Sequence, residues 1–225
     1  MSKADPPSEP RSGTDGERPL SRASVGRFSL YLRHLEQFHS AGTKTISSSQ
    51  LGEALGITDA QVRKDLAYLG NLGHPGVGYP TQDVIAALRR KLGIDREWRV
   101  VVVGAGNLAR ALLRYRGFQQ QGFRIVALFD ADAGKIGQRI DDLEVHSPDT
   151  MPAVVAATGA ELGLLTVPAE VAQGVADTLV AAGIRGVLNF APIVLRLPPH
   201  VSLVSVDLTV QLEQLAFLVQ LGGNE

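Results

Sequence analysis

In the first part of the chain, hydrophobic side chains recur with the period of amphipathic helices. Val25, Phe28 and Leu32, for example, fall on one face of the first expected helix. Ser47 and Thr58 each precede a glutamine by three residues, as in a capping box, so each marks an expected helix start. Helices are predicted at residues 24–40, 58–69 and 82–92, together with a short helix that opens at Ser47 and ends before Gly56.

The two middle helices have the spacing of a helix-turn-helix. The first of them carries Leu51, Ala54 and Leu55 on its expected buried side, and a glycine then turns the chain toward the second. Four closely spaced glycines within residues 70–78 disfavour a helix and predict a β-wing. Residues 21–93 are therefore predicted to form a winged helix-turn-helix domain.

Farther along the chain, short apolar runs alternate with amphipathic ones. Short apolar runs are typical of strands buried on both faces of a parallel sheet. Their alternation with helices predicts an α/β fold, here a doubly wound Rossmann sheet that is covered on both faces and spans residues 94–206. The strands are expected at 100–103, 125–129, 162–167, 186–190 and 201–206, and the helices at 108–115, 152–157, 169–182 and 208–221.

The two ends of the chain differ in character. Residues 1–20 hold four prolines and few apolar side chains, so we expect a disordered tail there. Residues 207–225 hold the last predicted helix, which has an apolar stripe along one side. The pattern leaves open whether this stripe packs within its own subunit or against a second one. The stripe consists of Leu208, Leu212, Leu215 and Val219.

Composition and charge narrow the function. The 225 residues include no cysteine, which excludes disulfides, zinc–thiolate sites and thiol nucleophiles, and no metal site is expected. The chain has no apolar run long enough for a bilayer and no secretory pattern, so we expect a cytoplasmic protein with no membrane partner. The net charge of −1 is uneven, because residues 21–92 carry nine basic and five acidic side chains. This positive segment coincides with the predicted helix-turn-helix, as phosphate contact requires.

The turn after the first predicted strand has the pattern of a dinucleotide-binding site. In G-x-G-x-x-A, the first glycine makes the turn, the second lets the backbone approach a pyrophosphate, and the small third residue lets helix and strand pack closely. Asp130 ends the next strand, where a carboxylate binds the ribose 2′-hydroxyl and favours NAD(H) over NADP(H). The alternative is a plain strand-to-helix turn, with Asp130 as an ordinary residue of a strand-end turn. Asp132 lies close enough in the sequence to be confused with Asp130. The expected cofactor-binding residues of the turn are Gly104, Ala105, Gly106, Asn107, Leu108 and Ala109.

The second helix of the helix-turn-helix is the expected recognition helix. Its outward Gln61 is suited to bidentate contact with adenine, and Arg63 or Lys64 to contact with guanine. The alternative is that the triplet 63–65 is a solvated charged face. The wing carries only His74 as a candidate cation. The expected DNA-binding residues are Ser47, Ser48, Gln61, Arg63, Lys64, Tyr68 and His74.

Several motifs resemble those of the Rex redox-sensing transcriptional repressors of bacteria, over about residues 22–219. They are Tyr31-Leu-Arg33, Gln61-Val-Arg-Lys-Asp-Leu66, Gly76-Val-Gly-Tyr79, Tyr115-Arg-Gly-Phe118, Phe129-Asp-Ala-Asp132, Thr166-Val-Pro168, Gly186-Val-Leu-Asn-Phe-Ala-Pro192 and Val206-Asp-Leu208. Two departures are Ala109, where a glycine is commoner, and His74-Pro75, where many relatives carry a basic wing residue.

This resemblance implies a homodimer that binds a palindromic operator in double-stranded DNA and releases it when NADH binds, and so senses NADH against NAD⁺. It implies that the last helix is exchanged between subunits, that is, domain-swapped. It also implies that Arg33, Tyr115 and Asp207 form a polar switch, with Tyr115 near the cofactor. From the residues alone, Arg33 is a solvated charge, Tyr115 a helix-end aromatic and Asp207 a helix N-cap.

An NAD-dependent dehydrogenase is the alternative function. Such an enzyme needs a group that transfers a proton beside the hydride. Three of the five histidines precede the Rossmann fold, and His146 and His200 have no evident partner in the sequence. About 120 residues follow the glycine turn, too few for a substrate domain. A nucleotide-binding structural subunit is a third class, but it would leave the helix-turn-helix unexplained. The sequence therefore favours a sensor and not an enzyme.

Overall fold

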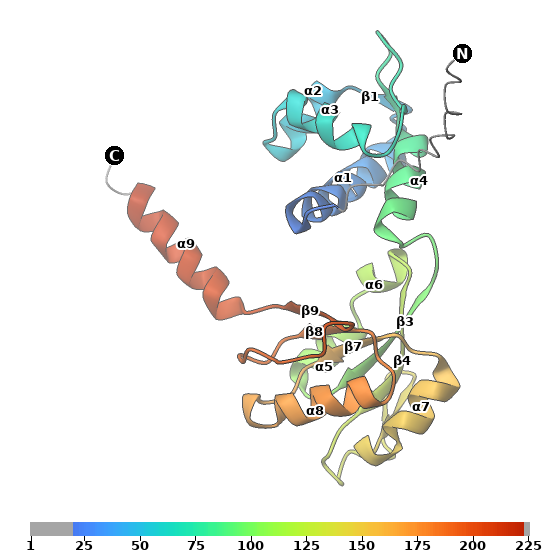
Figure 1. Ribbon diagram of the computed structural model, residues 1–225, viewed down its shortest axis with the longest axis vertical. Coiled ribbons are helices and arrows are strands. Elements are labelled where there is room, and N and C mark those ends of the chain that lie inside the picture. Colours follow the sequence, from blue (N-terminus) through green and yellow to red (C-terminus); the bar gives the residue numbers. More distant parts are fainter. Residues whose placement is uncertain (1–19, 223–225) are drawn as a thin grey trace, which may run out of the picture. The chain divides into compact units, whose positions relative to one another are not determined.

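The computed structural model describes residues 20–222. The tail that we expected at residues 1–20 lies outside this range, apart from its last residue. Contacts within the chain divide it into two compact units, and the boundary in the sequence falls between Gly93 and Ile94 (Figure 1). Each unit is described by itself below.

The first unit is a winged helix-turn-helix, which confirms this part of the expected fold. The helices α1 and α4 pack together, and so do α2 and α3, around a core that includes Phe28, Tyr31, Leu51, Leu66 and Leu88. A backbone bridge between residues 74 and 78 closes the wing. The elements of this unit are α1 (Arg22–Ser40), β1 (Thr45–Ile46), α2 (Ser48–Leu55), α3 (Asp59–Ala67), β2 (Tyr79–Pro80) and α4 (Thr81–Leu92).

The two helix starts marked by glutamines differ in the structure. At Ser47 the capping box is complete, because Ser47 Oγ accepts from the backbone of Gln50 and Gln50 Oε1 accepts from the backbone of Ser47. At Thr58 only the first half is made, because the Gln61 side chain turns to Asp65 instead. A second correction concerns Ala54, which we expected on the buried side of α2 and which is exposed.

The second unit is built on a seven-stranded sheet in the order β5-β6-β4-β3-β7-β8-β9. From β6 to β9 the strands are parallel and follow the Rossmann order, while the edge strand β5 is antiparallel. The elements are β3 (Trp98–Val103), α5 (Asn107–Leu113), α6 (Gly117–Gln120), β4 (Phe123–Phe129), β5 (Arg139–Ile140), β6 (Leu143–His146), a 3₁₀ turn (Pro148–Thr150), α7 (Met151–Thr158), β7 (Leu162–Leu165), α8 (Ala169–Ala181), β8 (Gly186–Asn189), β9 (Ser202–Ser205) and α9 (Leu208–Gly222).

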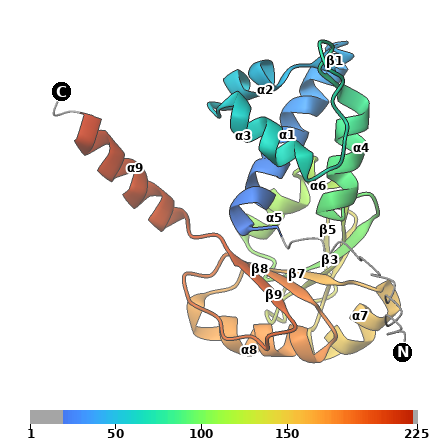
Figure 2. The ribbon, with the colours of Figure 1, turned by 45° about the horizontal axis from the view of Figure 1, so that its top comes forward.

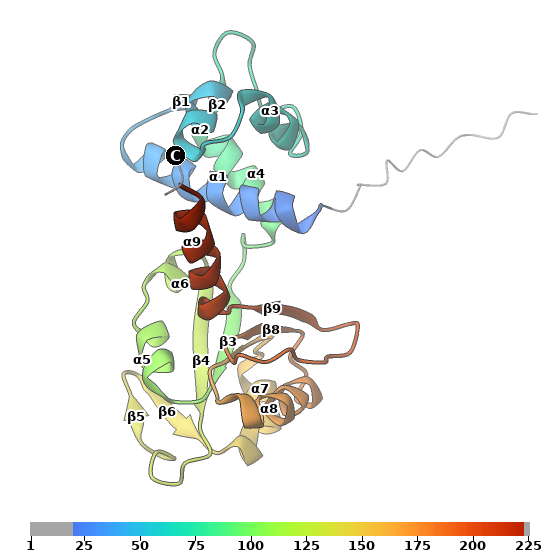
Figure 3. The same cartoon turned by 90° about the vertical axis from the view of Figure 1, so that its left-hand side faces the viewer.

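Alternate residues of the central strands serve two separate cores. Val101 and Val103 face the core that α7 and α8 complete, whereas Val100 and Val102 face the core that Ala109 of α5 joins. The helices α7 and α8 lie on one side of the sheet and α5 lies on the other (Figure 3). On the second face, however, an apolar groove of about 370 Å³ lies open. Helices lie on both faces, as expected, but α5 leaves part of the second face uncovered. The groove is lined by Val100, Phe118, Phe123, Ile125, Leu188 and Val204, among others.

The last helix, α9, buries none of its side chains (Figure 2). Leu212 and Val219 are 65% and 67% exposed, so the apolar stripe does not pack within its own subunit. Phe217 and Leu218 are also exposed, and they extend the apolar surface beyond the stripe. Among residues 20–222, no helix has the length and apolarity needed to span a membrane.

Candidate nucleic-acid interface and dinucleotide site

The glycine turn between β3 and α5 has the geometry that its sequence requires. Gly104 adopts a φ of +98°, and a Cβ there would lie 2.6 Å from the carbonyl oxygen of Thr166. Only glycine therefore fits this position. A Cβ on Gly106 would meet nothing within 4 Å, and this exposed residue caps α5 without a side-chain hydrogen bond. The first backbone N–H groups of α5 thus lie beside open space, as a pyrophosphate would need.

Asp130 connects the end of β4 to this turn. Its Oδ2 accepts from the backbone N–H of Ala105 at 2.7 Å and from Lys135 Nζ at 2.9 Å. Its Oδ1 accepts from the backbone N–H of Asp132 at 2.8 Å. Burial alone would raise the pKa of Asp130, but these three hydrogen bonds outweigh it and lower the pKa. The result is an ionised carboxylate at the strand end, with few lone pairs left for a ligand.

The structure also distinguishes Asp130 from Asp132. The Asp130 side chain is 12% exposed and touches the turn, whereas that of Asp132 is 56% exposed and caps the backbone of Gly134. Of the two, only Asp130 is part of the glycine-turn geometry. Lys135, which sequence reasoning missed, belongs to the same cluster. Its position five residues after a strand-end aspartate carried no motif that would have revealed it.

The remaining cofactor candidates lie along α5. Ala105 and Ala109 are buried, while Asn107 and Leu108 are exposed at the start of the helix. Tyr115 lies just past the other end, about 10 Å along the helix axis from the turn. Its ring is 54% exposed and meets Phe118 edge-on at 5.2 Å between centroids. Within residues 20–222, no cluster of three or more His, Asp or Glu side chains has the arrangement of a metal site.

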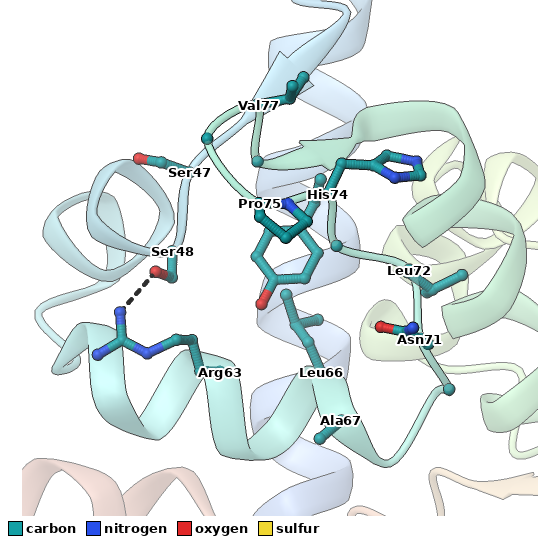
Figure 4. A pocket seen from close by; sticks show the side chains of 15 residues that line it. Ser47, Ser48, Arg63, Leu66, Ala67, Asn71, Leu72, His74, Pro75 and Val77 are labelled. Atoms are coloured by element: carbon teal, nitrogen blue, oxygen red, sulfur yellow. Dashed lines mark hydrogen bonds between the residues drawn. The ribbon is translucent and has the colours of Figure 1, made fainter.

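The first unit has an open pocket of about 770 Å³ between α3 and the wing (Figure 4). Four of the expected DNA-binding residues line it together, namely Ser47, Ser48, Arg63 and His74. Arg63 Nη1 donates to Ser48 Oγ at 3.1 Å and to Asp59 Oδ2 at 2.7 Å. The guanidinium therefore bonds to the first residue of α2 and to the first residue of α3. The pocket thus combines a cation, two hydroxyls and the wing.

The other expected DNA contacts lie outside this pocket. Lys64 is exposed on α3. Tyr68, which is 44% exposed, lines a second pocket with Arg90 and Lys91 of α4. Sequence reasoning missed Arg90 and Lys91, although the run of three basic residues at 89–91 was a visible signal. Gln61 lines neither pocket.

Asp65, which looks in the sequence like part of a charged surface triplet, is buried at 2% exposure. Its carboxylate accepts from Arg27 Nε at 2.5 Å and Nη2 at 2.8 Å, from Tyr31 Oη at 2.8 Å and from Gln61 Nε2 at 2.8 Å. Burial alone would raise the pKa of Asp65, but these hydrogen bonds outweigh it and lower the pKa. Asp65 therefore ties the recognition helix to α1 through an ionised, fully bonded carboxylate. The triplet is not a uniformly solvated face.

The residues expected to form the switch have simple local roles in the structure. Arg33 is exposed on α1 and makes no ion pair within residues 20–222. Asp207 caps α9, because its Oδ1 accepts from the backbone N–H of Thr209 at 2.9 Å and of Val210 at 3.3 Å. Tyr115 is a helix-end aromatic. A switching role for these three residues remains a prediction.

Comparison with known families separates the same two regions. A family model described as a putative DNA-binding protein N-terminus matches residues 19–67. A second family model, described as a CoA binding domain, matches residues 95–193. The first match covers the helix-turn-helix, and the second covers most of the Rossmann sheet.

Whole-length relatives identify the family. The chain is 48% identical to the redox-sensing transcriptional repressor Rex of Pelotomaculum thermopropionicum, over 89% of this chain and 95% of that protein. The crystal structure of RSP in complex with β-NAD⁺ and operator DNA matches with a TM-score of 0.86 and 34% identity, over 92% of this chain and 95% of that one. RSP in complex with β-NADH matches with a TM-score of 0.82 and 33% identity, over 91% and 96%. These relatives are repressors, so the dehydrogenase alternative is not favoured, and the chain belongs to the Rex family of redox-sensing transcriptional repressors.

Proposed function

We propose that this protein represses transcription by binding a palindromic operator as a homodimer and that NADH releases it from the DNA. The observation that carries the proposal is the presence, in one chain, of a helix-turn-helix and a dinucleotide turn that match RSP over nearly its whole length. RSP has been crystallised with operator DNA and with each of the two nucleotides. The protein would act in the cytoplasm, where its DNA target lies.

On the DNA side, α3 would enter the major groove and the wing would lie beside it. Arg63, which pairs with Asp59, and exposed Lys64 lie next to each other in the middle of α3. Ser47 and Ser48 would donate to phosphate from the start of α2. Tyr68 and the basic side chains of its pocket would contact the backbone farther along, whereas His74 would add little charge near neutral pH.

On the nucleotide side, the turn from Gly104 to Ala109 would hold the pyrophosphate. Open space at Gly106 fits close approach of a ligand, and Asp130 supplies the ribose contact. NADH brings the reduced nicotinamide, and Tyr115 lies at the far end of α5, at a distance that suits that ring. Ionised Asp130 would disfavour a 2′-phosphate by like-charge repulsion, although Lys135 partly offsets its charge.

The dimer would be formed by exchange of α9. This helix is apolar beyond a single stripe, and a helix of that kind needs burial on more than one side. The nucleotide-binding unit offers an apolar groove on the sheet face that α5 covers only in part. The exposed helix α9 and the apolar groove occur in the same chain, so a second copy can cover each of them. Two copies also present two helix-turn-helix units, as two operator half-sites require.

The switch would work through Asp207, which caps the first turn of the exchanged helix. An effector shifts an equilibrium only by its differential affinity for the two states, so NADH must bind the DNA-free form more tightly. Asp207 would respond to the cofactor through Tyr115 and pair with Arg33 of the second copy in one state. By linkage, operator DNA must weaken NADH binding by the factor by which NADH weakens DNA binding.

The experiment is a duplex titration with three nucleotides in parallel. Duplexes selected by the protein from a random pool would be titrated alone and with NADH, NAD⁺ or NADPH. We expect selection of a palindrome whose affinity falls when NADH is added, while NAD⁺ and NADPH have much smaller effects. Selection of no duplex, or an affinity that no nucleotide changes, would refute the proposed function.

A further inference from the structure

Two glutamines occupy equivalent positions in α2 and α3 but have different partners. Gln50 closes a capping box, so its carbonyl oxygen accepts from the backbone of Ser47 at 2.9 Å. Gln61 has the same relation to Thr58, yet its side-chain Nε2 donates to Asp65 Oδ1 at 2.8 Å. The difference arises because only α3 has a carboxylate four residues farther on, on the adjacent turn of the helix.

The partner of Gln61 determines which end of its amide faces outward. An ionised carboxylate only accepts hydrogen bonds, so the Gln61 NH₂ group must face Asp65. Asp65 cannot relax this requirement by rotating, because Arg27 and Tyr31 donate to the same carboxylate. It cannot relax it by protonation near neutral pH either, because these hydrogen bonds lower its pKa. The Gln61 carbonyl oxygen is therefore the end of the amide that faces away from Asp65, and the NH₂ group keeps one hydrogen that does not bond to Asp65.

We propose that Asp65 is a positioning residue that fixes the amide of Gln61, so that Gln61 reads a base through its carbonyl oxygen and requires an amino group on that base. In the major groove, adenine N6 and cytosine N4 present amino donors, whereas guanine and thymine present acceptors. A freely turning glutamine could face either kind of edge. The fixed one selects adenine or cytosine at the contacted nucleotide and rejects guanine and thymine.

This inference rests on the proposed DNA-binding function, in which the start of α3 faces base edges. Gln61 lies in the first turn of α3, where recognition helices meet bases, and it is only partly buried. Its neighbour Arg63 is held by Asp59 and Ser48 on the pocket side. The two side chains would thus read different edges, Arg63 as a donor and Gln61 as an acceptor.

The test uses a palindromic duplex that the protein itself selects from a random pool. Each adenine is replaced in turn by purine and each cytosine by 2-pyrimidinone, which removes the amino group alone. At one nucleotide per half-site, we expect this loss to weaken binding by roughly fivefold, the effect of one hydrogen bond. The Gln61→Ala variant should bind the unmodified duplex about fivefold more weakly than the unmodified protein does. Its affinity should then be the same for the duplex that carries the analogue. Gln50→Ala, the matched change in α2, should leave this response intact.

Asp65→Asn tests the positioning role. An asparagine whose amide oxygen keeps accepting from Arg27 Nε and Tyr31 Oη turns its NH₂ group toward Gln61 and loses the bond from Arg27 Nη2. Gln61 must then present its own NH₂ group outward. We expect the preference at the Gln61-dependent nucleotide to move from the amino-bearing base toward guanine. Two results would overturn the inference while leaving operator binding intact. One is an Asp65→Asn variant that prefers the amino-bearing base as strongly as the unmodified protein does. The other is a selected duplex in which the nucleotide that depends on Gln61 is guanine or thymine. If Asp65→Asn does not fold, the analogue series with Gln61→Ala decides alone. Failure to select any duplex would instead refute the proposed function itself.

Discussion

The two units of this chain differ in how fully they satisfy their own side chains. The winged-helix unit closes its core and buries Asp65, a carboxylate with four hydrogen bonds. The nucleotide-binding unit leaves a groove open on one sheet face and α9 exposed along its whole length. Large apolar surfaces of this kind mark interaction sites in natural proteins. The first unit therefore satisfies its polar and apolar groups internally, whereas the second leaves apolar surfaces that the proposed dimer would cover.

The largest expected effect comes from breaking that association. Leu212→Asp places a charge on the apolar surface of α9, where it would have to be desolvated in a dimer. We expect a monomer by analytical ultracentrifugation. We also expect a loss of operator affinity of about 10²- to 10⁴-fold, because the second half-site no longer contributes at a high effective concentration.

Gln220→Glu is the matched control on the same helix. It adds a charge at a position that is already polar and lies on the side of α9 that also carries Thr209 and Glu213, away from the apolar stripe. We expect it to remain dimeric and to bind the operator with nearly unchanged affinity. A dimer that survives Leu212→Asp would mean that α9 is not the association surface.

The next largest effect should separate the two units by their carboxylates. Asp65→Ala leaves Arg27, whose side chain is 27% exposed, without its buried partner, so we expect the free energy of unfolding to fall by about 3 kcal/mol. Glu161 in the nucleotide-binding unit pairs with Arg96 and Arg185, which are 48% and 67% exposed. Because solvent screens these pairs, Glu161→Ala should cost less than about 1 kcal/mol. Urea unfolding of both variants measures the difference, and equal losses would contradict the contrast between the units.

The sequence predictions were correct where the signal lies within a few residues and failed where the cause lies far away in the chain. The cap at Ser47, the strand that ends at Val103 and the turn at Gly104 have signals within a few residues, and all could be predicted. The short elements β5, β6 and α6 were missed, because two to four residues carry too little periodicity. The open sheet face was also missed, because alternation of strands and helices does not tell which face each helix covers.

The candidate site was predictable to a similar extent. The glycine turn and Asp130 were found from their spacing, and the structure brings them together through the Ala105 N–H. Asp65 entered the sequence predictions only through the alternative of a solvated charged face at residues 63–65. Its partners Arg27 and Tyr31 lie 38 and 34 residues away, so no local pattern announces the cluster. Gln61 was correctly placed in the first turn of α3, but its bond to Asp65 needed the structure.

Acid should act on the winged-helix unit through Asp65. The pKa of this carboxyl is lowered in the folded protein, below its usual value of 3.8. Its contribution to stability is therefore fully present above about pH 4, and it is lost as the pH falls through the folded pKa. We expect the difference in unfolding free energy between the unmodified protein and Asp65→Asn to be constant from pH 5 to 7 and to shrink below about pH 4. A difference that grew in acid would contradict the sign of this linkage.

A smaller effect is expected at Asp130 in the nucleotide-binding unit. Asp130→Ala removes the carboxylate that binds Ala105, Asp132 and Lys135, and it leaves Lys135 with only the longer ion pair to Asp132 Oδ2 at 3.8 Å. We expect NADH to bind about tenfold more weakly, since a charged hydrogen bond contributes about 1.5 kcal/mol or more. The affinity for NADPH should fall by less than that for NADH, or should rise, because Lys135 can then attract the 2′-phosphate. Isothermal titration of both nucleotides measures the ratio, with Asp132→Ala as the exposed control, and an unchanged ratio would remove Asp130 from cofactor selection.

The smallest expected effect concerns Gly117, which lies beneath Tyr115. A Cβ at Gly117 would come within 2.5–2.7 Å of the far end of the Tyr115 ring. Because that ring is 54% exposed, Gly117→Ala should move the ring and leave the fold intact. If Tyr115 relays the cofactor signal to Asp207, the variant should bind NADH within about threefold of normal, yet its operator affinity should respond less to NADH. Gly174→Ala, a helical glycine whose Cβ would meet nothing within 4 Å, is the control and should leave both properties unchanged. A full NADH response in Gly117→Ala, with the ring shown by NMR to have moved, would mean that the nucleotide-binding unit signals without the position of Tyr115.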